Sequence, residues 1–178
     1  MQTENNLSQE ILKSGLILGA LQIVLSMSFY LMDVSLLLGM NGMAVRMLFI
    51  IFAIIFLGLR TRASQNGLLT FADAFKTIFL IGFVGMAMDS TLLYILYNFV
   101  DTSLEQQTRE IAIETTQEML QKFNAPAEQV EKAIEQVENE NYSYTIGKMI
   151  QSIIVSGIFG AIFSAIVAAI IKKESKTF

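Results

Sequence analysis

The chain has 178 residues, of which 53% are hydrophobic and 16% are charged, and its net charge is −4. Because soluble domains carry about 25% charged residues, this composition favours a protein that lies largely in lipid. The acidic balance excludes a protein that binds nucleic acid through a basic surface, and the lack of any cysteine or histidine excludes disulfides, thiol chemistry and histidine catalysis.

The first long apolar run covers residues 11–32 and is interrupted only by Lys13, Gln22 and small residues. About 20 apolar residues are enough to cross a hydrocarbon layer as a helix. The polar residues 1–10 lack the basic start, short apolar core and cleavage site of a signal peptide. We therefore expect this first span to be retained.

The second apolar run covers residues 43–59, after a turn at residues 39–42. A run of about 17 residues is close to the minimum for crossing a core about 30 Å thick. We expect this span to recruit part of the turn or to thin the bilayer. Because Ala53 and Gly58 are almost its only small residues, we expect it to face lipid on most sides.

The third span is preceded by a helix-start signal. Thr70 followed by Asp73 has the spacing of a capping box, in which each residue satisfies an amide of the other, so a helix should begin at Phe71. No helix breaker follows, and the pattern becomes fully apolar over residues 77–100. We expect one continuous helix that runs from the interface into the membrane.

After residue 100 the composition inverts. Residues 101–148 hold ten acidic and four basic residues, a net charge of −6, with apolar residues at roughly helical spacing. Pro126 interrupts the pattern, because proline starts helices well but interrupts them badly. We expect an acidic extramembrane helical hairpin over residues 101–144, and a last span over residues 145–171. The fold class is then all-α, with one membrane domain of four spans.

Basic residues and tyrosines predict the orientation of these spans. Basic residues flanking the proposed inner ends are Arg60, Arg62, Lys76, Lys172, Lys173 and Lys176. Because short loops rich in lysine and arginine stay in the cytoplasm, both termini should be cytoplasmic, with the hairpin outside. Tyrosine favours the headgroup layer, and all five tyrosines fall at proposed outer ends of spans. They are Tyr30, Tyr94, Tyr97, Tyr142 and Tyr144.

Small residues predict where the spans meet, since close backbone approach drives helix packing in lipid. The fourth span carries two adjacent rows of small residues at four-residue spacing, and shorter rows occur on the first and third spans. The predicted packing residues are Gly15, Gly19, Gly82, Gly85, Ser152, Ser156, Gly157, Gly160 and Ser164. Two rows on one helix favour contact with a further helix, including one from a second copy of the chain.

Asp89 is predicted to lie near the middle of the third span, where an unpaired charge costs about 2.5–3.5 kcal/mol. Gln22 lies at the same predicted depth, so we expect a Gln22–Asp89 hydrogen bond, with Arg46 as a shallower alternative partner. Two interpretations stay open: Asp89 relays protons or cations, or its carboxyl group joins two helices.

The chain resembles the small bacterial inner-membrane proteins grouped as domain of unknown function family 4199. The resemblance rests on the glycine pair of residues 15–19, the entry motif of residues 67–76 and the acidic segment of residues 127–133. It implies a four-span membrane protein with no assigned activity, so no catalytic residue is carried over.

The function expected from these features is non-enzymatic. No phosphate-binding glycine loop, nucleophile elbow or paired membrane aspartates occur in the sequence, and we expect no catalytic residue, cofactor or metal site. The leading hypothesis is a membrane component that acts through contacts, as a homo-oligomer or as a partner of another membrane protein. The alternative is a small carrier or channel centred on Asp89.

Overall fold

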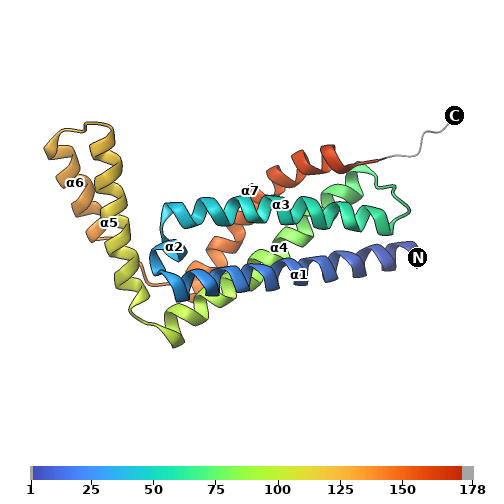
Figure 1. Ribbon diagram of the computed structural model, residues 1–178, viewed down its shortest axis with the longest axis horizontal. Helices are drawn as coiled ribbons and strands as arrows, with labels where there is room; N and C mark the ends of the chain where they lie inside the picture. The colour runs from blue at the N-terminus through green and yellow to red at the C-terminus, as the bar shows by residue number, and fades with distance from the viewer. Residues whose placement is uncertain (1, 174–178) are drawn as a thin grey trace.

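The computed structural model describes residues 2–173, which form helices joined by short connections (Figure 1). In chain order the elements are α1 (Gln2–Met32), α2 (Val34–Leu38), α3 (Met40–Ser64), α4 (Phe71–Ile95), the π-helical turn η1 (Leu96–Val100), α5 (Leu104–Lys122), α6 (Ala127–Glu138) and α7 (Ile146–Ile171). No strand forms within residues 2–173, so the predicted all-α fold is confirmed.

Four of these segments are long and apolar enough to cross a membrane. They are Asn6–Met32, Met40–Ser64, Phe71–Val100 and Ile146–Ile171. The number of spans agrees with the prediction, and the second span recruits part of the preceding turn, which was one of the two expected alternatives, because α3 begins at Met40. Helix α3 has 25 residues, because it continues through polar residues that end the apolar run without ending the helix. It can cross without thinning the bilayer.

Helix α4 is the centre of the bundle, packing against α1, α7 and α3. The core joins side chains from all four spans, including Leu18, Ile54, Ile78 and Val167. Helix α3 exposes Phe52 and Phe56 but buries five residues, so the expectation that it faces lipid on most sides holds for only part of its surface.

One end of the bundle gathers the basic residues. The backbones of Leu69 and Lys173 exchange two hydrogen bonds of 2.8 Å, which tie the α3–α4 loop to the end of α7. Arg62 donates a hydrogen bond of 2.8 Å to the carbonyl oxygen of Ile171 and so satisfies a free carbonyl at the end of α7. Lys176, which was assigned to this end, lies outside the described residues.

The predicted start of the third span is confirmed at Phe71. The hydroxyl of Thr70 accepts a hydrogen bond from the backbone amide of Asp73 at 3.2 Å. The carboxylate of Asp73 differs slightly from the expected pattern, because it accepts a hydrogen bond from that hydroxyl at 2.7 Å and not from the Thr70 amide. The cap still satisfies a free amide of the first turn.

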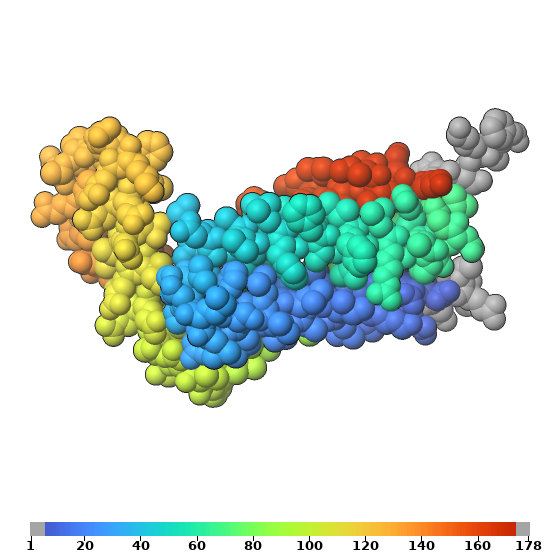
Figure 2. Space-filling view, viewed as in Figure 1, coloured from blue at the N-terminus to red at the C-terminus, as the bar shows by residue number. Residues whose placement is uncertain are grey.

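The acidic insert forms the predicted helical hairpin, with Pro126 directly before α6. The hairpin stands almost perpendicular to the long axis of the bundle (Figure 1). In the space-filling view its base touches the bundle and its upper part projects away from it, in yellow and orange (Figure 2). Leu104 fixes its base, because this residue is fully buried in a cluster with Leu37 and Leu96.

Tyrosines gather where the hairpin meets the bundle. The rings of Tyr97 and Tyr144 lie 5.5 Å apart, and the hydroxyls of Tyr97 and Thr108 share a hydrogen bond of 2.6 Å. Tyr30 donates a hydrogen bond of 3.2 Å to Asp101. These contacts join α1, the π-helical turn η1, α5 and the segment directly before α7, at the end of the bundle opposite Arg62 and Lys173.

Acid should weaken this junction through Asp101. The side-chain hydroxyl of Ser103 donates to its carboxylate at 2.5 Å, and the Ser103 amide and Tyr30 add further hydrogen bonds. These donors lower the pKa of Asp101 below its ordinary value of about 3.9. A depressed folded-state pKa contributes stability above the unfolded pKa, and that stability is lost as the pH falls through the folded value.

We therefore expect Asp101→Asn to lower the thermal unfolding midpoint at neutral pH. The gap between variant and wild type should shrink as the pH falls below about 4. Thermal melts of the purified protein over that range measure both effects. A gap that stays constant with pH would show that the charge of Asp101 is not what matters.

Candidate functional site: a buried ion pair beside an apolar cavity

Asp89 on α4 joins three helices through its carboxylate. The hydroxyl of Ser26 on α1 donates a hydrogen bond of 2.7 Å to one carboxylate oxygen. The guanidinium of Arg46 on α3 donates to the other oxygen and forms an ion pair. The side chains of Arg46 and Asp89 are only 19% and 13% exposed. Each charge therefore offsets the cost of placing the other among apolar helices.

The predicted Gln22–Asp89 hydrogen bond was wrong. Both carboxylate oxygens of Asp89 are held by other residues, and the amide oxygen of Gln22 accepts no hydrogen bond within the described chain. Arg46, the alternative partner, makes the contact. Ser26 on the first span was not predicted as a partner of Asp89.

The error came from the predicted depth of Asp89. Ser26 lies six residues before the end of α1, and Arg46 lies six residues after the start of α3, so both are about 9 Å from those ends. Asp89 lies six residues before the end of α4 at Ile95, and only the π-helical turn continues beyond it to pack against the base of the hairpin. The middle of residues 77–100, where Asp89 lies, is therefore not the middle of the bundle.

A cavity of about 550 Å³ lies between α3, α4 and α7 beside the ion pair. Its walls are mainly aliphatic and aromatic, and Arg46 and Gln22 form part of the lining. The apolar lining includes Ile50, Ile54, Phe79, Phe83, Phe159 and Phe163. Its volume falls in the range of about 300–1,000 Å³ typical of sites for small molecules.

The predicted packing glycines of the first and third spans lie where α1 meets α4. A β-carbon added at Gly15 would lie 2.8 Å from Val84, and one at Gly85 would lie 2.9 Å from Leu18. A β-carbon at Gly19 would overlap the sulfur of Met88. Gly82 differs from these three glycines, because it faces α3: a β-carbon added there would lie 3.4 Å from Ile54, and Gly82 also lines the cavity.

The small-residue rows of the fourth span divide into two parts. Ser164 is buried at the edge of the cavity and the following turn is buried in the bundle, whereas Ser156, Gly157 and Gly160 line the cavity on its open side. Nothing in the described chain lies within 4 Å of where a β-carbon on Gly157 or Gly160 would be. Ser152 shares a hydrogen bond of 3.1 Å with Tyr144. One continuous packing face along α7 is therefore not formed within this chain.

Four apolar helices with a polar cluster buried between them define a multi-pass α-helical membrane protein. The chain belongs to the family described as "Protein of unknown function (DUF4199)", whose sequence model matches residues 13–173. The resemblance inferred from the glycine pair, the entry motif and the acidic segment is thereby confirmed. No curated protein and no solved structure matches the chain.

Proposed function

We propose that this protein is a non-enzymatic interaction component of a bacterial inner membrane. The observation that carries this proposal is the hairpin of α5 and α6. Its base is fixed to the bundle by Leu104, whereas α6 packs mainly on α5. Phe123, at the far end of α5, is 79% exposed. A large apolar side chain at the tip of a fixed arm suits contact with another molecule.

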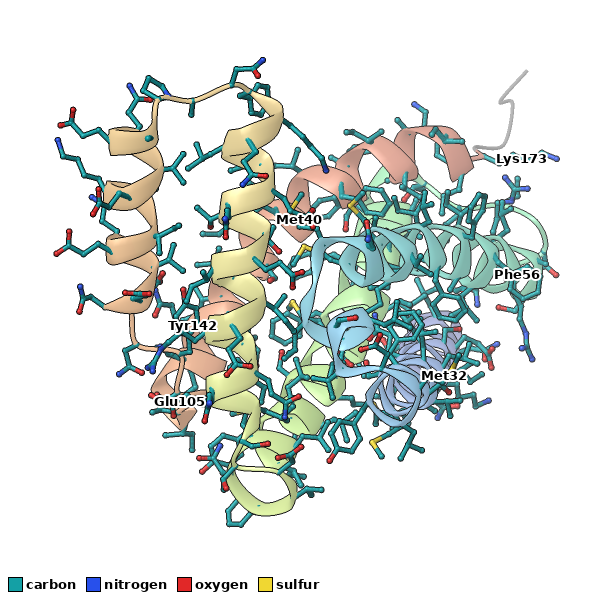
Figure 3. The ribbon with its side chains drawn as sticks, turned by 60° about the vertical axis from the view of Figure 1, so that its left-hand side comes forward. Met32, Met40, Phe56, Glu105, Tyr142 and Lys173 are labelled. Carbon is teal, nitrogen blue, oxygen red and sulfur yellow. The ribbon has the colours of Figure 1, made fainter. Side chains whose placement is uncertain are left out.

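The charges of the hairpin indicate the chemistry of its partner. Figure 3 shows α5 and α6 side by side, with Glu105 and Tyr142 near the end that meets the bundle. Glu118 and Lys122 are exposed near the tip, and the insert as a whole is acidic. A partner that offers an apolar patch bordered by basic groups would match this surface. The partner is a second copy of the chain or another membrane protein.

The orientation belongs to the same proposal. Arg62, Lys172 and Lys173 lie at the end of the bundle opposite the hairpin. Because cytoplasmic loops carry the excess of lysine and arginine, that end and both termini face the cytoplasm. The hairpin then lies outside, where its net negative charge is expected.

A single cysteine at the tip tests the orientation and the contact together, because the chain has no cysteine of its own. We expect Phe123→Cys to react in intact cells with a membrane-impermeant maleimide that carries a photoreactive group. Irradiation should then yield one discrete adduct, whose mass separates a second copy from a different protein. The matched control is Asn139→Cys, which is exposed at the opposite end of α6 and should yield no such adduct.

Two results would contradict the proposal. Reaction of the cysteine only after the membrane is broken would invert the orientation. Efficient reaction followed by no adduct, or by the same adducts at Phe123 and Asn139, would remove the tip as a contact surface.

The alternative function, a small carrier centred on Asp89, is supported by the cavity that reaches Arg46. We rank it second because both oxygens of Asp89 accept hydrogen bonds from Ser26 and Arg46, so the carboxylate joins three helices without any transported ion. Equal proton and cation flux in proteoliposomes containing wild type or Asp89→Asn would eliminate the carrier.

A further inference from the structure

Gln22 is the one predicted intramembrane polar residue that the ion pair does not use. It is 5% exposed, and its amide oxygen has no hydrogen-bond partner within residues 2–173. Buried polar groups are almost always hydrogen-bonded, and an unpaired one lowers stability. Gln22 also lines the cavity between α3, α4 and α7. The oxygen lies against Gly85 on α4, so the amide group turns over when a molecule in the cavity hydrogen-bonds with it.

The form of the cavity suits a molecule with a long apolar part. Most of its lining is aliphatic and aromatic. On α7, Gly157 and Gly160 leave open space where larger side chains would project. An apolar chain that lies along these glycines would restore the van der Waals contacts that an empty space lacks.

The polar residues of the cavity wall determine which head group such a molecule can have. Arg46 is already neutralised by Asp89, so an anionic head group would bring an unpaired charge into apolar surroundings. A guanidinium has five N–H donors, and its ion pair with Asp89 leaves others for a neutral acceptor. The amide of Gln22 can donate or accept, because rotation of its last bond exchanges oxygen and nitrogen. A hydroxyl or carbonyl group satisfies both residues.

We propose that this cavity binds one uncharged amphiphile, whose hydroxyl or carbonyl head group hydrogen-bonds with Gln22 and Arg46 while its apolar chain lies along Gly157 and Gly160. This inference goes beyond the proposed function, because it concerns the membrane-embedded surface and not the hairpin. Failure of the hairpin to capture a partner would leave it intact.

Photolabelling of the full-length protein in lipid nanodiscs tests the site. The probe is a long-chain alcohol with a diazirine in its chain, and the labelled residues are located by mass spectrometry. We expect saturable labelling at residues that line the cavity, such as Met47 and Phe159. A fatty acid with the same chain and diazirine should label these residues more weakly at neutral pH, because its carboxylate is charged.

Replacing Gln22 by methionine separates ligand binding from a structural role. Methionine has a similar length and fills irregular apolar space, so the fold should persist. Loss of one hydrogen bond should raise the alcohol concentration that gives half-maximal labelling about two- to tenfold. The thermal midpoint measured without probe should rise, because an unpaired buried amide is removed. A fall in that midpoint would assign Gln22 a structural hydrogen bond and overturn the proposal.

A matched pair of glycine variants tests the position of the apolar chain. Gly160→Leu places a side chain in the open space of the cavity, whereas Gly147→Leu makes the same change on α7 outside the cavity lining. We expect the first variant to abolish saturable labelling and the second to keep it. Equal labelling in both variants would place the probe on the outer lipid-facing surface and overturn the proposal.

A second copy of the chain is the competing occupant of the cavity. Single cysteines at Ser156 would then form disulfide-linked dimers in native membranes, and the alcohol probe would not label the cavity. That result would overturn the proposal. Monomeric Ser156→Cys together with saturable labelling that depends on Gln22 would support it.

Discussion

Replacing Asp89 by leucine is expected to destabilise the bundle by about 3–5 kcal/mol. The substitution leaves the guanidinium of Arg46 without its carboxylate among apolar side chains, and an arginine cannot release its proton to become neutral. It also removes the acceptor for Ser26. Reversible unfolding in mixed detergent micelles measures the loss.

The reverse substitution and the double variant complete the test. Arg46→Met should also destabilise the bundle, because it leaves the carboxylate of Asp89 without its counter-ion. The double variant should recover most of the stability, since replacing both members of a buried pair by apolar residues is often neutral. Losses of less than about 1 kcal/mol in both single variants would mean that the pair is as solvated as a surface salt bridge.

The second large effect is expected at Gly42, which the sequence presents only as part of a turn. A β-carbon on Gly42 would overlap the backbone carbonyl of Leu36, so Gly42→Ala must open the corner between α2 and α3. Overpacking of this kind typically costs about 1–3 kcal/mol, and a backbone neighbour has little freedom to move. Because Leu37 in this corner packs in the cluster that holds Leu104, proteolysis within α5 should also become faster.

Gly160→Ala is the matched control for this substitution. Gly160 is also helical, but no atom lies within 4 Å of the position of its β-carbon. The same change should therefore raise the free energy of unfolding by about 0.5–1 kcal/mol, because glycine is a poor helix former. If both variants shift stability in the same direction, the close approach of Leu36 to Gly42 is not a feature of the folded protein.

The elements whose signals are local were predictable from the sequence. Apolar runs long enough to cross a bilayer identify the spans, and Thr70 with Asp73 marks the start of the third span through hydrogen bonds within one turn. Pro126 marks the break of the hairpin, because proline removes an amide donor wherever it stands.

The candidate site was predicted only in part. Asp89 and Gln22 were identified as polar residues inside the membrane, because polar residues are rare in apolar runs of this length. The partners of Asp89 were not settled by the sequence, because a carboxylate can accept a hydrogen bond from any donor that reaches it. Ser26, Arg46 and Asp89 meet because each lies six residues from the hairpin end of its own helix. The relative positions of helix ends depend on the whole bundle.

The sequence by itself determined the class of protein, the four spans, the hairpin and the polar residues within the membrane, because hydropathy, capping and proline act over a few neighbouring residues. The tertiary structure decided which small residues are in contact and which are open. Gly85 and Gly157 both stand in small-residue patterns, yet Leu18 lies against the first and an apolar cavity against the second. A missing side chain permits close approach without specifying what approaches, so only the packing of distant segments separates a helix contact from a binding site.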